Sequence, residues 1–274
     1  MNGKGENCQK DLQTMRIFLP HSCYLLPKDV LKSISEVSEK FQIPVHIHLH
    51  ETEREIEEYA QKNNGETAIQ TLDKLGLLNE RLIAAHCVHL TKEEIQLLAK
   101  KKVNIVHCPK SNMKLASGVC PTQEYINQGI NVALGTDGPC SNNSLSMINE
   151  MQAAALIGKI SPLRKSAAQI PCKTVIKMAT INGAKAFGLE KKLGSLEKGK
   201  LADMVAIHLD SPSCLPLYDP LFALVYSMGP RVTDVFIDGK RIVENGIVKT
   251  FKLDQDKIIK FGKDIEEFKI KNNF

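Results

Sequence analysis

The chain of 274 residues is long enough to bury a large core, and its 43% hydrophobic and 24% charged residues are typical of a globular protein. It lacks an apolar run of the roughly 18 residues that a membrane span needs, and its net charge of +5 comes from lysines interspersed with glutamates, which argues against nucleic-acid binding. Eight scattered cysteines without a CxxC pair, and no visible secretory signal, predict a cytoplasmic protein with reduced thiols.

Short apolar runs alternate with amphipathic helices along the first half of the chain. The expected strands are 16–19, 44–49, 81–87, 103–108 and 131–137. The expected helices are 28–41, 52–63, one beginning near 67, 91–101 and 121–128. Continuous apolar strands that alternate with helices are typical of a parallel sheet covered by helices.

Each of these strands is followed by a polar side chain suited to catalysis. The strand ends carry His21, His48 with Glu51, His86, His107 and Asp137. In a closed barrel of eight strand and helix units, the carboxyl ends of the strands converge on one face that carries the active site. An open, doubly wound sheet would use only a crevice between strands, so this series of polar strand ends favours the barrel.

Histidines are concentrated at one strand end, where His46, His48 and His50 alternate and Glu51 follows. Alternate residues of an extended strand share a face, so the three imidazoles are expected to point the same way. A lone histidine is more often a hydrogen-bonded core residue than a ligand. Several imidazoles beside a carboxylate instead predict a metal or acid–base site.

The sequence pattern changes beyond Asp137. Helices are expected at 145–157 and 174–187, the segments 194–200 and 235–246 have the pattern of short strands joined by tight turns, and a charged helix is expected at 253–268. We therefore expect three parts. These are a partial (β/α) barrel with the catalytic face at 15–190, the carboxyl-terminal part of a β-sandwich at 191–250, and a helical tail at 251–274.

Six segments form a distinctive set when taken together and in order: 48–52 (HLHET, starting at His48), 85–90 (AHCVHL), 107–115 (HCPKSNMKL), 135–138 (GTDG) with 141–143 (SNN), 179–184 (ATINGA) and 194–203 (GSLEKGKLAD). In these segments the chain resembles the amidohydrolase superfamily and, within it, the 5-methylthioadenosine and S-adenosylhomocysteine deaminases. The resemblance implies an α/β fold, a TIM-like barrel of the metal-dependent hydrolase type that is incomplete here, with strands 4 to 8 present, plus a small β element. It also implies hydrolytic deamination of a purine nucleoside to the inosine analogue and ammonia.

The resemblance implies a role for each matching position. His48 is similar to a metal ligand, and Asp137 to a ligand that also acts as general base and contacts the substrate. Glu51 is similar to the substrate-binding carboxylate that carries a proton to the leaving amine. His86 is similar to the catalytic histidine that polarises the attacked group, and His21 to a substrate-binding histidine. The implied cofactor is one divalent metal, zinc in preference to the iron or manganese that accept the same ligands.

The chain departs from the family on its amino-terminal side. Barrels of the family begin with a strand whose His-x-His pair supplies two metal ligands, and no such pair precedes His21. The ligands present here are His48 and Asp137, with His86 as a further candidate, whereas catalytic zinc sites usually have three protein ligands, and this argues against activity of the chain on its own. An incomplete barrel also exposes strand edges, which favours homo-oligomers or association with another chain.

Two alternatives stay open from the sequence. The first keeps the fold but changes the substrate to guanine, cytosine or a triazine, and the amine or halide released from a panel of substrates distinguishes it. The second is a non-catalytic fragment in which the histidines persist without a metal.

Overall fold

The structure is a computed structural model that describes residues 15–161, 165–227, 231–251 and 254–272. Its strands form two four-stranded sheets, the first parallel with the order β1-β2-β3-β4 and the second antiparallel with the order β5-β6-β7-β8. The strands are β1 (Val45–Leu49), β2 (Leu82–His86), β3 (Asn104–His107), β4 (Asn131–Leu134), β5 (Met204–His208), β6 (Arg231–Ile237), β7 (Lys240–Glu244) and β8 (Ile247–Val248).

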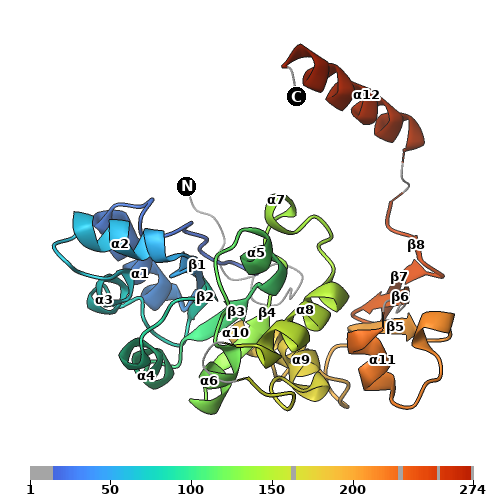
Figure 1. The fold of residues 1–274 in the computed structure, drawn as a ribbon, viewed down its shortest axis with the longest axis horizontal. Coiled ribbons are helices and arrows are strands. Elements are labelled where there is room, and N and C mark those ends of the chain that lie inside the picture. The colour runs from blue at the N-terminus through green and yellow to red at the C-terminus, as the bar shows by residue number, and fades with distance from the viewer. Residues whose placement is uncertain (1–14, 162–164, 228–230, 252–253, 273–274) are drawn as a thin grey trace.

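Helices flank the parallel sheet and separate it from the antiparallel one (Figure 1). They are α1 (Lys28–Phe41), α2 (Glu53–Lys62), α3 (Ala68–Lys74), α4 (Lys92–Lys100), α5 (Pro109–Lys114), α6 (Thr122–Asn127), α7 (Pro139–Asn142), α8 (Met147–Lys159), α9 (Cys172–Met178), α10 (Ile181–Ala186), α11 (Pro220–Tyr226) and α12 (Gln255–Lys271). Within the described residues the parallel sheet stays open, and this confirms the expectation of an incomplete barrel followed by a small β element.

Strand β1 shows why the site lies on one face of the parallel sheet. Its side chains alternate, so that Val45, Ile47 and Leu49 are buried in the core while His46 and His48 on the opposite face are only partly buried. The core side packs against apolar side chains of the covering helices, such as Leu31 of α1. The opposite face is therefore left to carry polar groups.

The segment around residues 16–22 lies beside β1 but is not a regular strand. It makes isolated parallel bridges, Phe18 with Val45 and Ser22 with His48. The backbone N–H groups of His46 and His48 donate to the carbonyls of Phe18 and His21, each at 2.9 Å. These bonds place His21 next to the carboxyl end of β1.

Besides the strand expected at 16–19, three expected elements differ from the structure. The helix expected at 174–187 is wrong, because it is interrupted at Thr180, whose backbone is non-helical and whose hydroxyl donates to the carbonyl of Ile176 at 2.7 Å. The strand expected at 194–200 is also wrong, since that segment consists of turns, and the strand β5 that follows it was missed. The strand expected at 131–137 ends at Leu134.

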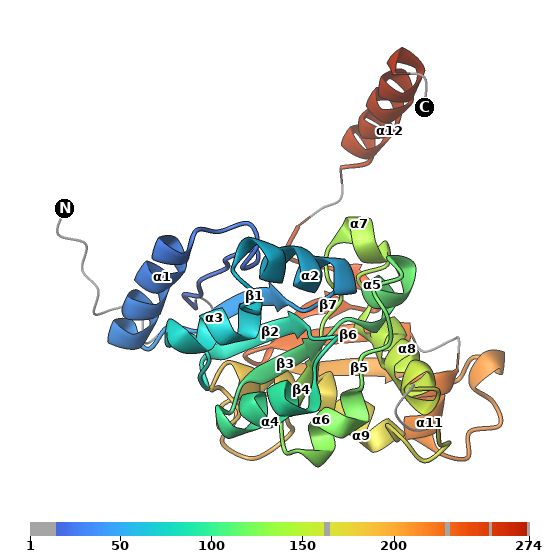
Figure 2. The ribbon, with the colours of Figure 1, turned by 60° about the vertical axis from the view of Figure 1, so that its left-hand side comes forward.

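The carboxyl-terminal part contains the antiparallel sheet, helix α11 between β5 and β6, and helix α12 after β8. Strand β6 pairs with β5 and β7, and β7 turns back into β8 at Asn245-Gly246, where both residues have positive φ. Helix α12 extends away from the rest of the described chain in both views (Figures 1 and 2). None of the described helices combines the length and the apolar character that crossing a membrane requires.

Replacing Gly194 with alanine is expected to destabilise the fold more than the same change at Gly129. Both glycines have positive φ, 91° and 78°, which costs an alanine about 1–2 kcal/mol. At Gly194 the added Cβ would lie 2.8 Å from Cβ of Ala184, whereas at Gly129 nothing lies within 4 Å. Crowding should therefore add about 1–3 kcal/mol at Gly194. Urea unfolding of both variants measures the difference, and equal losses would contradict the steric argument.

Candidate metal centre

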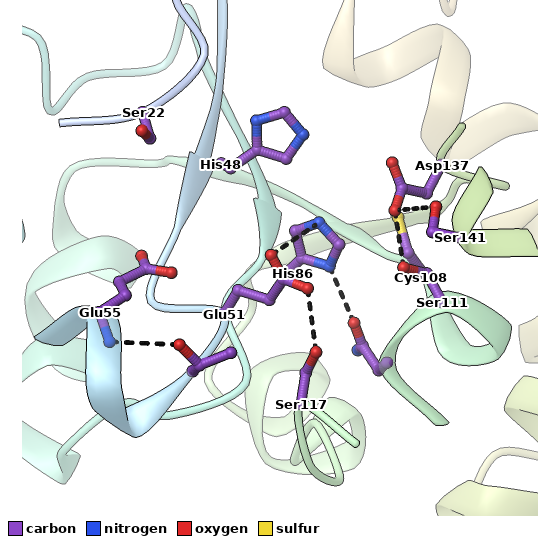
Figure 3. Close-up of polar contacts among 12 residues, drawn as sticks. Ser22, His48, Glu51, Glu55, His86, Cys108, Ser111, Ser117, Asp137 and Ser141 are labelled. Carbon is purple, nitrogen blue, oxygen red and sulfur yellow. Dashed lines mark hydrogen bonds and ion pairs between the residues drawn. The ribbon is translucent and has the colours of Figure 1, made fainter. Parts of the chain in front are cut away.

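Three side chains that can bind a metal converge at the carboxyl end of the parallel sheet. His48 lies near the end of β1, His86 is the last residue of β2, and Asp137 follows β4. One donor atom from each lies within 4.8 Å of those of the other two. Figure 3 shows the three side chains directed toward a common space. They come from neighbouring parts of one parallel sheet, whose strand ends meet at the same edge.

Left-handed backbone occurs at the carboxyl ends of all three of these strands, with His50 after β1 at a φ of 50°. His86 and Asp137 have φ values of 70° and 59°, and Cys87 next to His86 has a φ of 47°. Residues other than glycine rarely adopt this left-handed conformation. Such residues persist only where the surrounding structure enforces them, and they cluster at functional sites. Positive φ also occurs at other non-glycine residues, such as Gln42 and Lys102, so here it accompanies the convergence of the side chains and adds no separate assignment.

The carboxylate of Asp137 is held by two serine hydroxyls. Ser111 and Ser141 each donate to its Oδ2 at 2.6 Å (Figure 3). Partial burial acts to raise the pKa of Asp137, but these two hydrogen bonds and the backbone N–H of Gly138 outweigh it, and the pKa lies below its usual value. Asp137 is therefore a carboxylate at neutral pH, which is the form that a metal ion requires.

Glu51 and His21 lie next to the three converging side chains. Oε2 of Glu51 is 3.8 Å from Nε2 of His86, and Oε1 accepts a hydrogen bond of 2.9 Å from Ser117 (Figure 3). The ring of His21 lies 4.5 Å from that of His48, centroid to centroid. Desolvation and the neighbouring His48 lower the pKa of His21. The five residues assigned to the site from sequence are thus close together.

The other histidines of the region occupy different positions. His46 shares the face of His48, with 6.1 Å between the ring centroids. The expectation that His50 shares this face is wrong, because it lies beyond β1 with a φ of 50°, and its Nδ1 is 3.1 Å from the carbonyl of His89. His107 is 2% exposed, and its Nδ1 has no hydrogen-bond partner among the described residues.

The donor set fits a divalent metal ion. The resemblance gave two ligands, His48 and Asp137, and a separate catalytic role for His86. In the structure the imidazole of His86 joins the other two, and three protein donors are usual in a catalytic zinc site. Nitrogen and carboxylate donors of this kind also accept iron and manganese.

Four polar residues around the site were given no role from the sequence, although three of them lie in segments that carry the resemblance. They are Ser111, Asn112, Ser117 and Ser141. Ser111 and Asn112 lie in the short helix α5, which was not expected either. The available signal was Pro109 directly after a strand end, since proline is favoured in the first turn of a helix. The partners of Ser111, Asn112 and Ser117 could not be inferred, because each of these partners lies at the carboxyl end of a different strand.

Similarity to known proteins shows which family the chain belongs to. The sequence profile of the amidohydrolase family matches residues 6–242. The chain belongs to the amidohydrolase family. It is 47% identical over 232 residues to a 5-methylthioadenosine/S-adenosylhomocysteine deaminase of Teredinibacter turnerae, an alignment that covers 83% of this chain and 51% of that protein. The chain spans about half the length of the curated relatives it matches.

Solved structures share the same fold. A zinc-bound adenosine deaminase from Xanthomonas campestris superposes with a TM-score of 0.85 at 36% identity, over 92% of this amidohydrolase chain and 56% of that one. A zinc-complexed atrazine chlorohydrolase from Arthrobacter aurescens superposes with a TM-score of 0.81 at 24% identity, over 90% and 53% of the two chains. The second similarity shows the fold alone. Together they confirm the barrel type expected from the sequence.

Acid is expected to destabilise the protein through His107. Burial, with a smaller contribution from His86, lowers the pKa of His107 from 6.5 to about 3. The unfolded chain protonates this residue below pH 6.5 while the folded protein does not, so its contribution to stability is complete above pH 6.5 and is lost as the pH falls toward about 3.

The test compares the wild type with His107→Gln by urea unfolding between pH 7 and pH 4, in the presence of a chelator. The wild type should lose stability more steeply, by up to about tenfold in the folding equilibrium constant per pH unit. Parallel curves would show that His107 is not held neutral in the folded state.

Proposed function

We propose that this amidohydrolase site is that of a metal-dependent deaminase of adenine nucleosides such as S-adenosylhomocysteine and 5-methylthioadenosine. The observation that supports it most is the convergence of His48, His86 and Asp137, with Glu51 at their side. The name of the Teredinibacter turnerae relative and the adenosine deaminase title of the Xanthomonas campestris structure point to the same substrate class.

The proposed reaction replaces the exocyclic amine of the purine with an oxygen atom from water. Water adds to the carbon that bears the amine, the carbon–nitrogen bond breaks, and the products are the inosine analogue and ammonia. A zinc ion, when bound by His48, His86 and Asp137, supplies Lewis acidity. The protein groups then have to remove one proton from water and deliver one to the departing amine.

Two carboxylates are available for these proton transfers. Asp137, kept ionised by the hydroxyls of Ser111 and Ser141, takes the proton from the attacking water. Glu51 passes a proton to the leaving amine, since its Oε2 lies on the side of His86 while Ser117 holds its other oxygen. His86 contributes its Nε2 to the centre, and His21 at the rim contacts the nucleoside.

The test is a zinc measurement and a substrate panel. The purified chain is analysed for bound zinc, and ammonia release is followed with S-adenosylhomocysteine, 5-methylthioadenosine, adenosine, guanine and cytosine, with halide release from a chlorinated triazine. Because the relatives are about twice as long, the panel is repeated with the amino-terminal half of the Teredinibacter turnerae deaminase added as a separate chain.

We expect bound zinc, and ammonia from the adenine nucleosides in at least the supplemented assay. Release from guanine, cytosine or the triazine alone would replace the proposed substrate class. Stoichiometric zinc without turnover of any substrate in either assay would contradict the deaminase proposal.

A further inference from the structure

Helix α5 reaches two members of the metal centre at once. It begins directly after β3, which lies between β2 and β4 in the sheet. Two consecutive residues of α5 make the contacts. Ser111 donates to Oδ2 of Asp137, beyond β4, and Oδ1 of Asn112 lies 2.8 Å from Nδ1 of His86, at the end of β2. Both α5 residues are buried, with exposed fractions of 0% and 1%.

The contact from Asn112 determines which nitrogen of His86 carries hydrogen. An amide oxygen only accepts hydrogen bonds, so Nδ1 of His86 has to donate. A neutral imidazole with hydrogen on Nδ1 has its lone pair on Nε2. Nε2 is also the atom that faces Glu51. The hydrogen bond therefore leaves Nε2 as the nitrogen able to bind a cation.

The position of Asn112 is poorly explained by packing alone. Its Nδ2 is buried and has no hydrogen-bond partner among the described residues. A buried amide with an unpaired donor is a cost to stability that an apolar side chain would avoid. The compensating feature is its oxygen, which is the partner of His86.

Hydrogen bonds also orient the other two candidate ligands, His48 and Asp137. Nδ1 of His48 lies 2.6 Å from the carbonyl oxygen of His21, so it too carries hydrogen and leaves Nε2 with the lone pair. Oδ2 of Asp137 accepts from two hydroxyls, which fixes the rotation of the carboxylate. When the atom of a ligand side chain that does not bind the metal makes a hydrogen bond, that bond orients the side chain and raises metal affinity. For His86 the orienting hydrogen bond comes from the side chain of Asn112, which a mutation can replace.

We propose that Asn112 is a positioning residue that holds His86 in the Nδ1–H tautomer, so that Nε2 is free to join the metal centre. The link from tautomer to metal binding rests on the proposed function, whereas the tautomer itself does not.

The tautomer can be measured directly in the metal-free protein. Long-range proton–nitrogen spectra of protein labelled with ¹⁵N-histidine distinguish Nδ1–H from Nε2–H, and the His86→Gln variant assigns the signals. We expect Nδ1–H for His86 in the wild type, measured in chelator at a pH where the ring is neutral. Nε2–H in the wild type would mean that the amide of Asn112 faces the other way, and it would overturn the proposal without any variant.

Two variants of Asn112 separate positioning from packing. Asn112→Asp keeps an acceptor oxygen and should keep the Nδ1–H tautomer. Asn112→Leu has a similar volume without an acceptor and should shift His86 toward Nε2–H, the form that free imidazole side chains favour in water. An unchanged tautomer in Asn112→Leu would show a merely structural role, and Asn112→Ala provides the same comparison if the leucine variant does not fold.

Zinc affinity gives the second readout. Competition with a chelating dye should show affinity reduced by about 10- to 100-fold in Asn112→Leu and near the wild type in Asn112→Asp. Equal affinity in the wild type and a folded Asn112→Leu protein would refute the link to metal binding. Failure of the deaminase assay would leave both readouts intact, so the two proposals can fail separately.

Discussion

Replacement of Asp137 with asparagine is expected to abolish the function of the metal centre while leaving the fold intact. The change keeps the size of the side chain and an oxygen that can accept from Ser111 and Ser141, but it removes the negative charge. A neutral amide is a weak metal ligand and cannot take a proton from water. We expect zinc affinity to fall by at least about 100-fold and deamination by about 1,000-fold.

Competition titration of zinc and the ammonia assay measure these two losses. Asp210→Asn is the matched control, because the side chain of Asp210 is 76% exposed beside His208 and lies outside the converging donors. This control should retain zinc and turnover. A folded Asp137→Asn protein with the zinc affinity of the wild type would remove Asp137 from the metal centre.

Replacement of Tyr125 with alanine is expected to cause a large loss of stability. Tyr125 in α6 is 0% exposed and is among the largest fully buried side chains. Its hydroxyl donates to the carbonyl oxygen of Cys87 at 2.5 Å. This bond holds the strained turn that follows β2, where His86 and Cys87 both have positive φ. Loss of a buried aromatic ring typically costs about 3–5 kcal/mol, and the lost hydrogen bond adds about 1 kcal/mol.

Tyr125→Phe isolates the contribution of the hydroxyl, and Tyr218→Ala is a control at an exposed tyrosine. Tyr125→Phe removes only the hydroxyl and should lose about 1 kcal/mol, because the buried Cys87 carbonyl then keeps only the weak thiol donor of Cys120 at 3.7 Å. Tyr218→Ala, at a side chain that is 91% exposed, should stay within about 0.5 kcal/mol of the wild type. Urea unfolding measures all three. A loss in Tyr125→Ala no larger than in Tyr218→Ala would contradict the assigned packing.

Much of the parallel sheet could be predicted from local patterns. Apolar runs alternating with amphipathic helices predicted the positions of β1 to β4, since strands such as β2 that are buried on both faces are continuously apolar, while β1 buries every second residue. The patterns failed where a tertiary contact decides. At Thr180 a side-chain hydrogen bond interrupts the expected helix. Strand β5, most of whose side chains are exposed, lacks the buried pattern that would have identified it.

By itself the sequence determined which chemistry is present and at which strand ends. His48, Glu51, His86 and Asp137 were identifiable because a residue directly after a parallel strand lies at the shared carboxyl edge of the sheet. Only the tertiary structure decided which of these side chains meet. The backbone turns away from extended geometry at His50, His86 and Asp137, which removes His50 from the face of His48 and brings the other two to it.

The tertiary structure also decided which atoms are available at that meeting point. Asn112 and Ser111 follow β3, yet they act on side chains that follow β2 and β4. Contacts between neighbouring strands depend on register and backbone rotation, which local periodicity does not encode. The sequence thus gives the candidate ligands, while the fold selects the nitrogen of His86 and holds the carboxylate of Asp137.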